Sequence, residues 1–276
     1  MIKVAFVDLD GTLLNNAKQV TSRTLRALAA CHTNGIRTLI ATGRPPLLQR
    51  MMPWAADAWV LFDGGVYSNG ACVFVGETKV YAHIETDAVR QVLAVVQRQP
   101  DLNVALQLDD EVHAFRFLPD MSLEDPWGVD FADALTLAQA DKTKANKILV
   151  FYAGLVDTER RMTQPLIAEI IAAAGGMAES YVTDGGLCVQ MAPLGVSKKR
   201  GIEMLRVHLG LGADEIAVFG DDVNDMEMLS AYPNSYVMGN ADAAVKACAQ
   251  FSAPLNEDDG VARVLEEIIQ RQGGRL

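Results

Sequence analysis

The opening residues hold the feature that most constrains the fold, a predicted strand at residues 3–9 in which a short apolar run, residues 4–7, meets the carboxylate of Asp8. Its apolar residues are continuous, a pattern typical of a strand buried on both faces of a parallel sheet. A helix beginning at Thr21 or Ser22 and ending at Gly35 follows, and then a second buried strand at residues 36–41. This βαβ pattern predicts an α/β protein with a doubly wound parallel sheet.

The last third of the chain repeats the alternation of strands and helices. The predicted strands lie at residues 215–219 and 235–238, and the predicted helices at 202–209, 225–230 and 261–271. These elements extend the same parallel sheet, so the first and last parts of the chain are expected to form one core.

The middle of the chain has a different pattern, with more hairpins than a doubly wound sheet usually contains. We predict helices at 87–99 and 157–174, a strand at 148–152, and hairpins at 103–118, turning at Asp109-Asp110, and at 181–191, around Asp184-Gly185. The predicted organisation is therefore a core made of residues 1–83 and 193–276, with an inserted α+β domain at residues 84–192.

Composition limits the classes of partner. The 276 residues carry 24 basic and 35 acidic side chains, a net charge of −11, which argues against a nucleic-acid binder. The chain shows neither a signal peptide nor an apolar run long enough to span a membrane, and its four cysteines stand alone. We expect a cytoplasmic protein, a monomer or weak homodimer, that binds neither nucleic acid nor membrane.

Three of the apolar strands end in short polar clusters. The clusters are Asp8-Leu9-Asp10-Gly11-Thr12, Thr42-Gly43-Arg44 and Gly220-Asp221-Asp222-Val223-Asn224-Asp225. One such cluster alone is typical of a solvated loop. Because the carboxyl ends of parallel strands line one edge of a sheet, where ligands bind, three clusters together predict a single pocket.

Carboxylates dominate this predicted pocket. Asp8, Asp10 and Asp221 would repel one another without a cation, and their oxygens are the ligands that Mg²⁺ prefers. The spacing after Asp8 does not fit a calcium-binding EF-hand loop, and nucleotide-binding glycine motifs are absent from the sequence. A carboxylate can also attack phosphorus, so we predict Asp8 as a nucleophile and Asp10 as its acid/base.

Four motifs in this order resemble those of the haloacid dehalogenase-like phosphohydrolase superfamily. They are Asp8-Leu9-Asp10-Gly11-Thr12-Leu13-Leu14, Thr42-Gly43-Arg44, Gly195-Val196-Ser197-Lys198 and Gly220-Asp221-Asp222-Val223-Asn224-Asp225. The Thr-Gly-Arg form, with a large insert before the third motif, is similar to the Cof-type branch. The resemblance spans almost the whole chain, and it implies a Rossmann-like core with an inserted α/β cap that sets substrate choice.

The resemblance also implies a role for each motif residue. Asp8 would be the nucleophile and a Mg²⁺ ligand, and Asp10 an acid/base that also binds the metal through its backbone carbonyl. The other implied roles are phosphate binding by Thr42, Gly43 and Asn224, substrate contact by Arg44, charge neutralisation by Lys198, and metal binding by Asp221 and Asp225.

Two assignments stay open. Lys199 and Arg200 follow Lys198, so the sequence leaves open which lysine enters the site, and alone this run is typical of a solvated helix start. The family's Asn-Gly-Ala turn matches Asn69, which we choose as a phosphate-binding residue, although Asp63 lies in a similar turn. His113, Arg116, Tyr181 and Asp184 are possible cap contacts, each more typical of ordinary surface.

The function expected from these residues is a Mg²⁺-dependent phosphatase of small phosphorylated metabolites, with sugar phosphates as the expected substrates, working through an aspartyl-phosphate. A phosphomutase or phosphotransferase would use the same intermediate. A non-enzymatic phosphate-binding regulatory protein is a further alternative, against which the presence of both Asp8 and Asp10 speaks. A signalling receiver domain would be about half this length and would carry its acceptor aspartate further along the chain.

Overall fold

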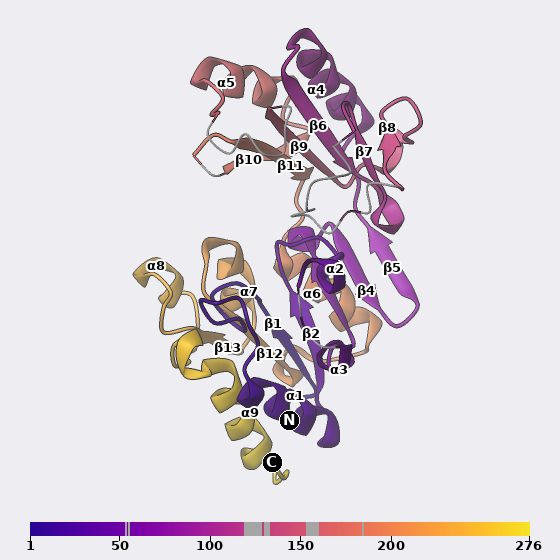
Figure 1. Cartoon of the computed structure of the whole chain (residues 1–276). Coiled ribbons are helices and arrows are strands. Elements are labelled where there is room, and N and C mark those ends of the chain that lie inside the picture. Colours follow the sequence, from indigo (N-terminus) through magenta and orange to yellow (C-terminus); the bar gives the residue numbers. More distant parts are fainter. Residues whose placement is uncertain (53, 55, 119–128, 130–132, 153–159, 184) are drawn as a thin grey trace. The chain divides into compact units, whose positions relative to one another are not determined.

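The computed structural model describes residues 1–52, 54, 56–118, 129, 133–152, 160–183 and 185–276. The chain divides into two compact units (Figure 1). The first unit comprises Met1–Pro45, Met52–Val80 and Ser197–Leu276, and the second comprises Pro46–Met51 and Tyr81–Val196. The predicted insert at residues 84–192 lies within the limits of the second unit, and its role as a cap stays a prediction.

An eight-stranded sheet forms the centre of the first unit, in the order β14-β13-β12-β1-β2-β3-β4-β5. The strands are β1 (Val4–Val7), β2 (Arg37–Ala41), β3 (Gly64–Tyr67), β4 (Cys72–Val75), β5 (Thr78–Tyr81), β12 (Ile216–Gly220), β13 (Asn234–Val237) and β14 (Phe251–Ser252). Pairing is parallel from β14 through β3, whereas β3 and β4 are antiparallel. The predicted α/β fold class is therefore confirmed.

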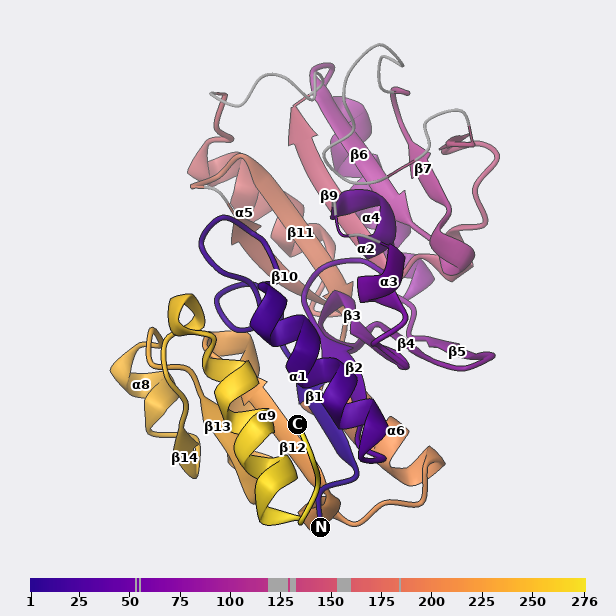
Figure 2. The same ribbon diagram turned by 60° about the horizontal axis from the view of Figure 1, so that its bottom comes forward.

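Helices cover both faces of this sheet. They are α1 (Ser22–Thr33), α3 (Ala56–Trp59), α6 (Lys198–His208), α7 (Met226–Ala231), α8 (Ala243–Lys246) and α9 (Gly260–Arg271). Figure 2 shows α1 and α9 side by side on one face. Side chains from α6 and α7 pack on the other face against Val4 and Phe6 of β1. Each fully buried Leu or Phe in such a core contributes about 1.5–3 kcal/mol.

The second unit contains a six-stranded sheet in the order β10-β11-β9-β6-β7-β8. Its elements are β6 (Leu102–Gln107), β7 (His113–Phe115), β8 (Leu135–Thr136), β9 (Lys147–Tyr152), β10 (Ala178–Thr183), β11 (Cys188–Pro193), and the helices α2 (Leu48–Met51), α4 (Thr86–Arg98) and α5 (Gln164–Ala173). The predicted hairpins are present, because β6 pairs antiparallel with β7 and β10 with β11. Apolar residues of α4 and α5 pack on one face of this sheet.

One expectation about secondary structure was wrong, and several strands were not predicted. The helix predicted from residue 157 begins at Gln164, since Thr163 takes the N-cap position and Pro165 favours the first turn. Residues 157–159, and Asp184 of the predicted second hairpin turn, lie outside the described residues. The strands β3, β4 and β5 were missed, because each is short and turn residues interrupt their segment.

Among the described residues, no helix is both long enough and apolar enough to cross a membrane.

Candidate active site

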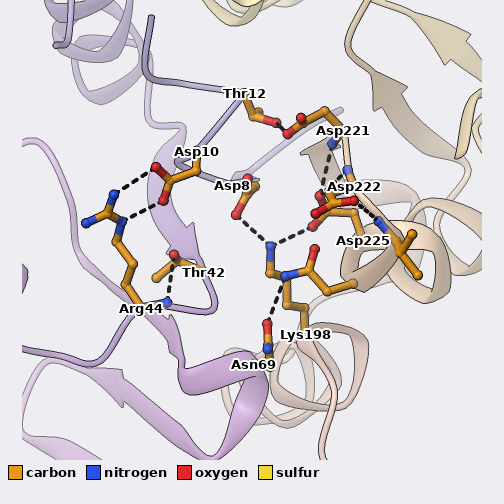
Figure 3. A network of polar contacts seen from close by, with 12 residues as sticks. Asp8, Asp10, Thr12, Thr42, Arg44, Asn69, Lys198, Asp221, Asp222 and Asp225 are labelled. Carbon is orange, nitrogen blue, oxygen red and sulfur yellow. Dashed lines mark hydrogen bonds and ion pairs between the residues drawn. The ribbon is translucent and has the colours of Figure 1, made fainter. Parts of the chain in front are cut away.

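The candidate site lies at the carboxyl ends of β1, β2 and β12, in the first unit (Figure 3). The chain runs outward from β1 through β2 to β3 on one side, and from β12 through β13 to β14 on the other. This reversal places a topological switch point between β1 and β12, where parallel sheets form ligand-binding crevices. Asp8 follows β1 and Asp221 follows β12, so both carboxylates lie at that point.

Lys198 connects two of the predicted acidic residues. Its ammonium donates to Asp8 Oδ1 at 2.6 Å and to Asp225 Oδ1 at 2.7 Å, and the residue is only 1% exposed. Ser197 caps the helix start by accepting from the backbone N–H of Arg200, which places Lys198 at the first position of α6. The structure therefore directs Lys198 into the site, whereas Lys199 is only partly buried.

Asp225 is a fully buried carboxylate whose hydrogen-bonding capacity is largely occupied. Its Oδ2 accepts from the backbone N–H groups of Asp221 and Asp222, at 2.9 and 3.1 Å, while its Oδ1 accepts from Lys198. These bonds close the tight turn after β12. Asp225 is thus well placed to fix the conformation of the loop that carries Asp221.

Asp221 is held by the loop that follows β1. The hydroxyl of Thr12 donates to Asp221 Oδ1 at 2.6 Å. Gly11, with a φ of +80°, lies so close that a Cβ there would be 2.1 Å from Asp221 Oδ2. Only glycine combines this left-handed conformation with such a close approach.

Asn240 is a residue of this site that sequence reasoning missed. Its amide donates to the carbonyl of Gly11 at 2.8 Å and lies 3.3 Å from Asp221 Oδ2. A signal was available, since Gly239-Asn240 follows the predicted strand at residues 235–238 as the other polar clusters follow theirs. Lys18, described below, was also missed.

Three carboxylates converge closely enough to hold a metal ion. Asp8, Asp221 and Asp225 each offer an oxygen within 4.8 Å of the others. Because Asp225 is engaged with Lys198 and two backbone N–H groups, Asp8 and Asp221 provide the oxygens with remaining capacity. Such a hard, oxygen-rich donor set fits a small divalent cation that retains several water ligands.

Burial and like charge shift the proton affinities of this group. Burial raises the pKa of Asp221 to about 6; the Thr12 hydrogen bond opposes the rise and the neighbouring Asp225 and Asp222 add to it. Burial also raises the pKa of Asp8, although the Lys198 ammonium works against that rise. For Lys198, burial would lower the pKa, but the charges of Asp8 and Asp225 outweigh it and raise the pKa overall. A bound cation would relieve the repulsion that these shifts record.

Asp10 is placed differently from the other carboxylates. Its oxygens accept from Arg44, from Nε at 2.6 Å and Nη2 at 2.8 Å, and from the Lys18 ammonium at 2.7 Å. Partial burial would raise the pKa of Asp10, but the hydrogen bonds from these two cations outweigh it and hold the pKa at about 2. The side chain of Asp10 is therefore an ionised carboxylate outside the three-carboxylate group, and Arg44 binds Asp10.

The predicted phosphate-binding residues surround the end of β2. Asn69 donates its backbone N–H to the carbonyl of Thr42 and accepts from the Asn224 side chain at 3.0 Å. A Cβ on Gly43 would be 3.1 Å from Asn69 Oδ1, so these segments are tightly packed. Asp63 precedes β3 and thus lies at the opposite edge of the sheet, where it pairs with Arg37. The structure brings Asn69, and not Asp63, to the site.

The possible cap contacts have mixed environments within the second unit. His113 is buried, contrary to the surface position expected, because its strand turns it inward, and burial lowers its pKa to about 4. Arg116 donates to the carbonyls of Val96, Gln99 and Leu102, which is a structural role. Tyr181 is exposed.

Several known proteins are similar to this chain in sequence. The protein YbjI of Escherichia coli (strain K12), named as a 5-amino-6-(5-phospho-D-ribitylamino)uracil phosphatase, is 29% identical, and the match covers 98% of this chain and 97% of YbjI. An Arabidopsis thaliana protein named as the chloroplastic endoribonuclease YBEY is 28% identical over 93% of this chain, but this chain spans only 45% of that protein.

A solved structure described as a sugar phosphatase of subclass IIB in this superfamily has the same fold. Its TM-score is 0.72 at 24% identity, and the match covers 96% of this chain and 98% of that one. The family model for haloacid dehalogenase-like hydrolases matches residues 5–265. The resemblance seen in the four motifs is thereby confirmed, and the chain belongs to the haloacid dehalogenase-like hydrolase family.

Proposed function

We propose that this phosphatase of the haloacid dehalogenase-like family hydrolyses small phosphorylated metabolites with Mg²⁺, through an aspartyl-phosphate on Asp8. The observation that carries the proposal is the contact of Asp8 with Lys198, beside Asp221 at the switch point of the sheet. A lysine next to a carboxylate nucleophile neutralises the charge that would otherwise repel a phosphate ester. Asp8 and Asp221, with the backbone carbonyl of Asp10 by family resemblance, would hold the ion.

The reaction would proceed in two displacements. In the first, a carboxylate oxygen of Asp8 attacks phosphorus, the bond from phosphorus to the leaving oxygen breaks, and Asp10 delivers a proton to that oxygen. In the second, Asp10 takes a proton from water as the water oxygen attacks phosphorus, and the bond from phosphorus to Asp8 breaks. The ionised Asp10 of this structure matches its second role. Bound Mg²⁺ would supply positive charge to the phosphoryl oxygens.

Phosphate binding is proposed for the residues around β2. Thr42 is buried and its hydroxyl already accepts from the backbone N–H of Arg44, which fixes the hydroxyl group's position. Gly43, Asn69 and Asn224 lie beside it, and amide and backbone N–H groups bind phosphoryl oxygens without adding charge.

Asp225 would act indirectly, because it holds both Lys198 and the loop that carries Asp221 in place.

For the substrate, we propose a phosphate monoester on a polyhydroxylated carbon chain, such as a sugar phosphate. A structure with the same fold is described as a sugar phosphatase, and YbjI is named for a substrate that carries a phosphoribityl group. Both names contain this chemical unit. A screen of phosphate release from sugar phosphates, polyol phosphates and nucleotides would identify the substrate.

The nucleophile is tested by Asp8→Asn, with release of phosphate from p-nitrophenyl phosphate as the assay. We expect activity to fall by about a thousandfold or more, because an amide cannot form the acyl-phosphate. Asp214→Asn is the matched control, since Asp214 is exposed and precedes β12, at the opposite edge of the sheet. Activity retained in Asp8→Asn, or hydrolysis that persists fully in EDTA, would contradict the proposal. Phosphate release without a bisphosphate activator separates hydrolysis from mutase chemistry.

A further inference from the structure

Lys18 is a second cation on the predicted acid/base. Its ammonium lies 2.7 Å from Asp10 Oδ1, the same oxygen that accepts from Arg44 Nη2. Arg44 comes from the loop after β2, while Lys18 comes from the loop after β1. The carboxylate of Asp10 is thus held from two directions, by groups on two separate segments of the first unit.

The backbone of Lys18 adopts an unusual conformation. Its φ is +59°, in the left-handed region, which is sparsely populated by residues other than glycine, asparagine and aspartate. A left-handed conformation costs a residue with a Cβ about 1–2 kcal/mol. Such positions cluster at functional sites, where surrounding structure maintains them. Lysine has no conformational advantage in this left-handed position. We therefore attribute its presence here to the contact between its side chain and Asp10.

The loop that carries Lys18 is closed by its own hydrogen bonds. The backbone N–H of Lys18 donates to the carbonyl of Asn15 at 2.9 Å, and the side chain of Asn15 accepts from the backbone N–H of Gln19 at the same distance. The backbone N–H of Asn15 in turn donates to the carbonyl of Gln19. These contacts form a compact turn whose shape sets the direction of the Lys18 side chain.

The same loop is fastened to the C-terminal part of the first unit. The side chain of Asn256 donates to the carbonyl of Leu14 at 2.9 Å, and the carboxylate of Glu257 accepts from the backbone N–H of Asn16. One anchor therefore lies just before the turn, at Leu14, and the other lies within it, at Asn16. An exposed lysine on an unconstrained loop would contribute little through an ion pair, but this one is presented by a fixed turn.

We propose, on the basis of the function proposed above, that Lys18 is a positioning residue for Asp10 in the hydrolysis of the phosphoenzyme. In that step Asp10 takes a proton from the attacking water, the water oxygen bonds to phosphorus, and the bond from phosphorus to Asp8 breaks. Lys18 and Arg44 together set where the accepting oxygen of Asp10 lies. Lys18 itself does not exchange a proton in the step.

The test is steady-state and rapid-quench kinetics of Lys18→Met with p-nitrophenyl phosphate. The nitrophenolate group leaves without needing a proton, so formation of the phosphoenzyme, reported by kcat/KM, should stay within about twofold of the unaltered chain. Breakdown of the phosphoenzyme should slow by about tenfold, a part of what a general base contributes. We therefore expect kcat and KM to fall together, with a burst of nitrophenolate that approaches one per site.

Two further variants make the interpretation specific. Lys18→Arg should restore most of kcat, since a guanidinium can also donate to Asp10 Oδ1. Lys3→Met is the matched control, because Lys3 is a similarly exposed lysine that pairs with Glu215, before β12. It should leave both kinetic constants unchanged.

A fall in kcat/KM that parallels kcat would overturn the inference, because it would indicate a role in substrate binding or in general integrity of the site. An unchanged kcat would overturn it equally. If the unaltered chain releases no phosphate from p-nitrophenyl phosphate, the proposed function itself fails, and this inference with it. The two failures are therefore distinguishable by the activity of the unaltered chain.

Discussion

The ammonium of Lys198 lies 2.6 Å from Asp8 Oδ1, although 190 residues separate the two in the sequence. Both side chains are almost completely removed from water, and Asp225 accepts from the same ammonium. Neither carboxylate would be stable as a lone buried charge, and neither would the lysine. The three residues consequently depend on one another for stability as well as for the proposed chemistry.

Lys198→Met should lower both activity and stability. The free energy of unfolding is expected to fall by about 3–5 kcal/mol, because Asp8 and Asp225 lose their buried counter-charge. Activity should fall by about a hundredfold or more, since the neutralising charge at the nucleophile is lost. Lys199→Met changes the neighbouring lysine, which lies outside this contact, and should alter stability by no more than about 0.5 kcal/mol. Urea unfolding and phosphate release measure both; equal effects of the two substitutions would contradict the assignment of Lys198.

The pKa of Asp221 predicts how stability without metal depends on pH. Burial raises the pKa of Asp221 in the folded chain from 3.8 to about 6. The contribution of this carboxyl group to the free energy of unfolding is therefore complete below pH 3.8 and is lost as pH rises through about 6. In EDTA, Asp221→Asn should therefore be more stable than the unaltered chain at pH 7, and this difference should shrink toward pH 4. Thermal melts across this range measure the difference, and a constant difference would refute the prediction.

Gly11→Ala should disrupt the metal site more than it disrupts the fold. A Cβ at this position would be 2.1 Å from Asp221 Oδ2, so the carboxylate must move. Gly35→Ala is a close match, because Gly35 has a φ of +74° and nothing within 4 Å of an added Cβ. Both should lose about 1–2 kcal/mol from the left-handed conformation. Only Gly11→Ala should raise the Mg²⁺ concentration for half-maximal activity, and similar Mg²⁺ curves for both would contradict this interpretation.

Asn240→Ala tests a site residue that sequence reasoning missed. Its amide bridges Gly11 and Asp221, so its removal should loosen the loop that positions Asp221. We expect the Mg²⁺ concentration for half-maximal activity to rise by about three- to tenfold, a cost of the size of one hydrogen bond. Maximal activity at saturating Mg²⁺ should change little. A loss of maximal activity with an unaltered Mg²⁺ curve would contradict a role through Asp221.

Much of this architecture could be predicted because local patterns and long-range structure agree. The continuous apolar strands ending at Asp8 and Asp221 required a parallel sheet, and a parallel sheet required their ends to meet. The start of the helix at Gln164 could not be placed from the sequence, because Arg160, Arg161 and Met162 are residue types that also favour a helix, yet the structure leaves them outside it.

Side-chain partners were the least predictable part of the site. Arg44 was expected to face the substrate, yet in the structure it binds Asp10. This contact depends on the register of β1 against β2, which local sequence patterns do not specify. The contact between Lys18 and Asp10 depends on the left-handed backbone conformation of Lys18 inside a turn. Such conformations are predicted from glycine, asparagine or aspartate, so a lysine gives no sign of one. The choice of Asn69 over Asp63 rested on the family's turn motif alone, and its physical reason came only with the direction of β3, which decides which turn lies at which edge of the sheet.

The distance along the chain between Asp8 and its partners has a consequence for biosynthesis. Asp8 is translated before any of the second unit, whereas Lys198, Asp221 and Asp225 follow only after the whole second unit has been translated. A nascent chain that has completed β1 and β2 still lacks β12 on the other side of β1, so it cannot yet present the candidate site. Ribosome-bound fragments that end before residue 225 should therefore be inert, and the first appearance of phosphatase activity would report the completion of the core sheet.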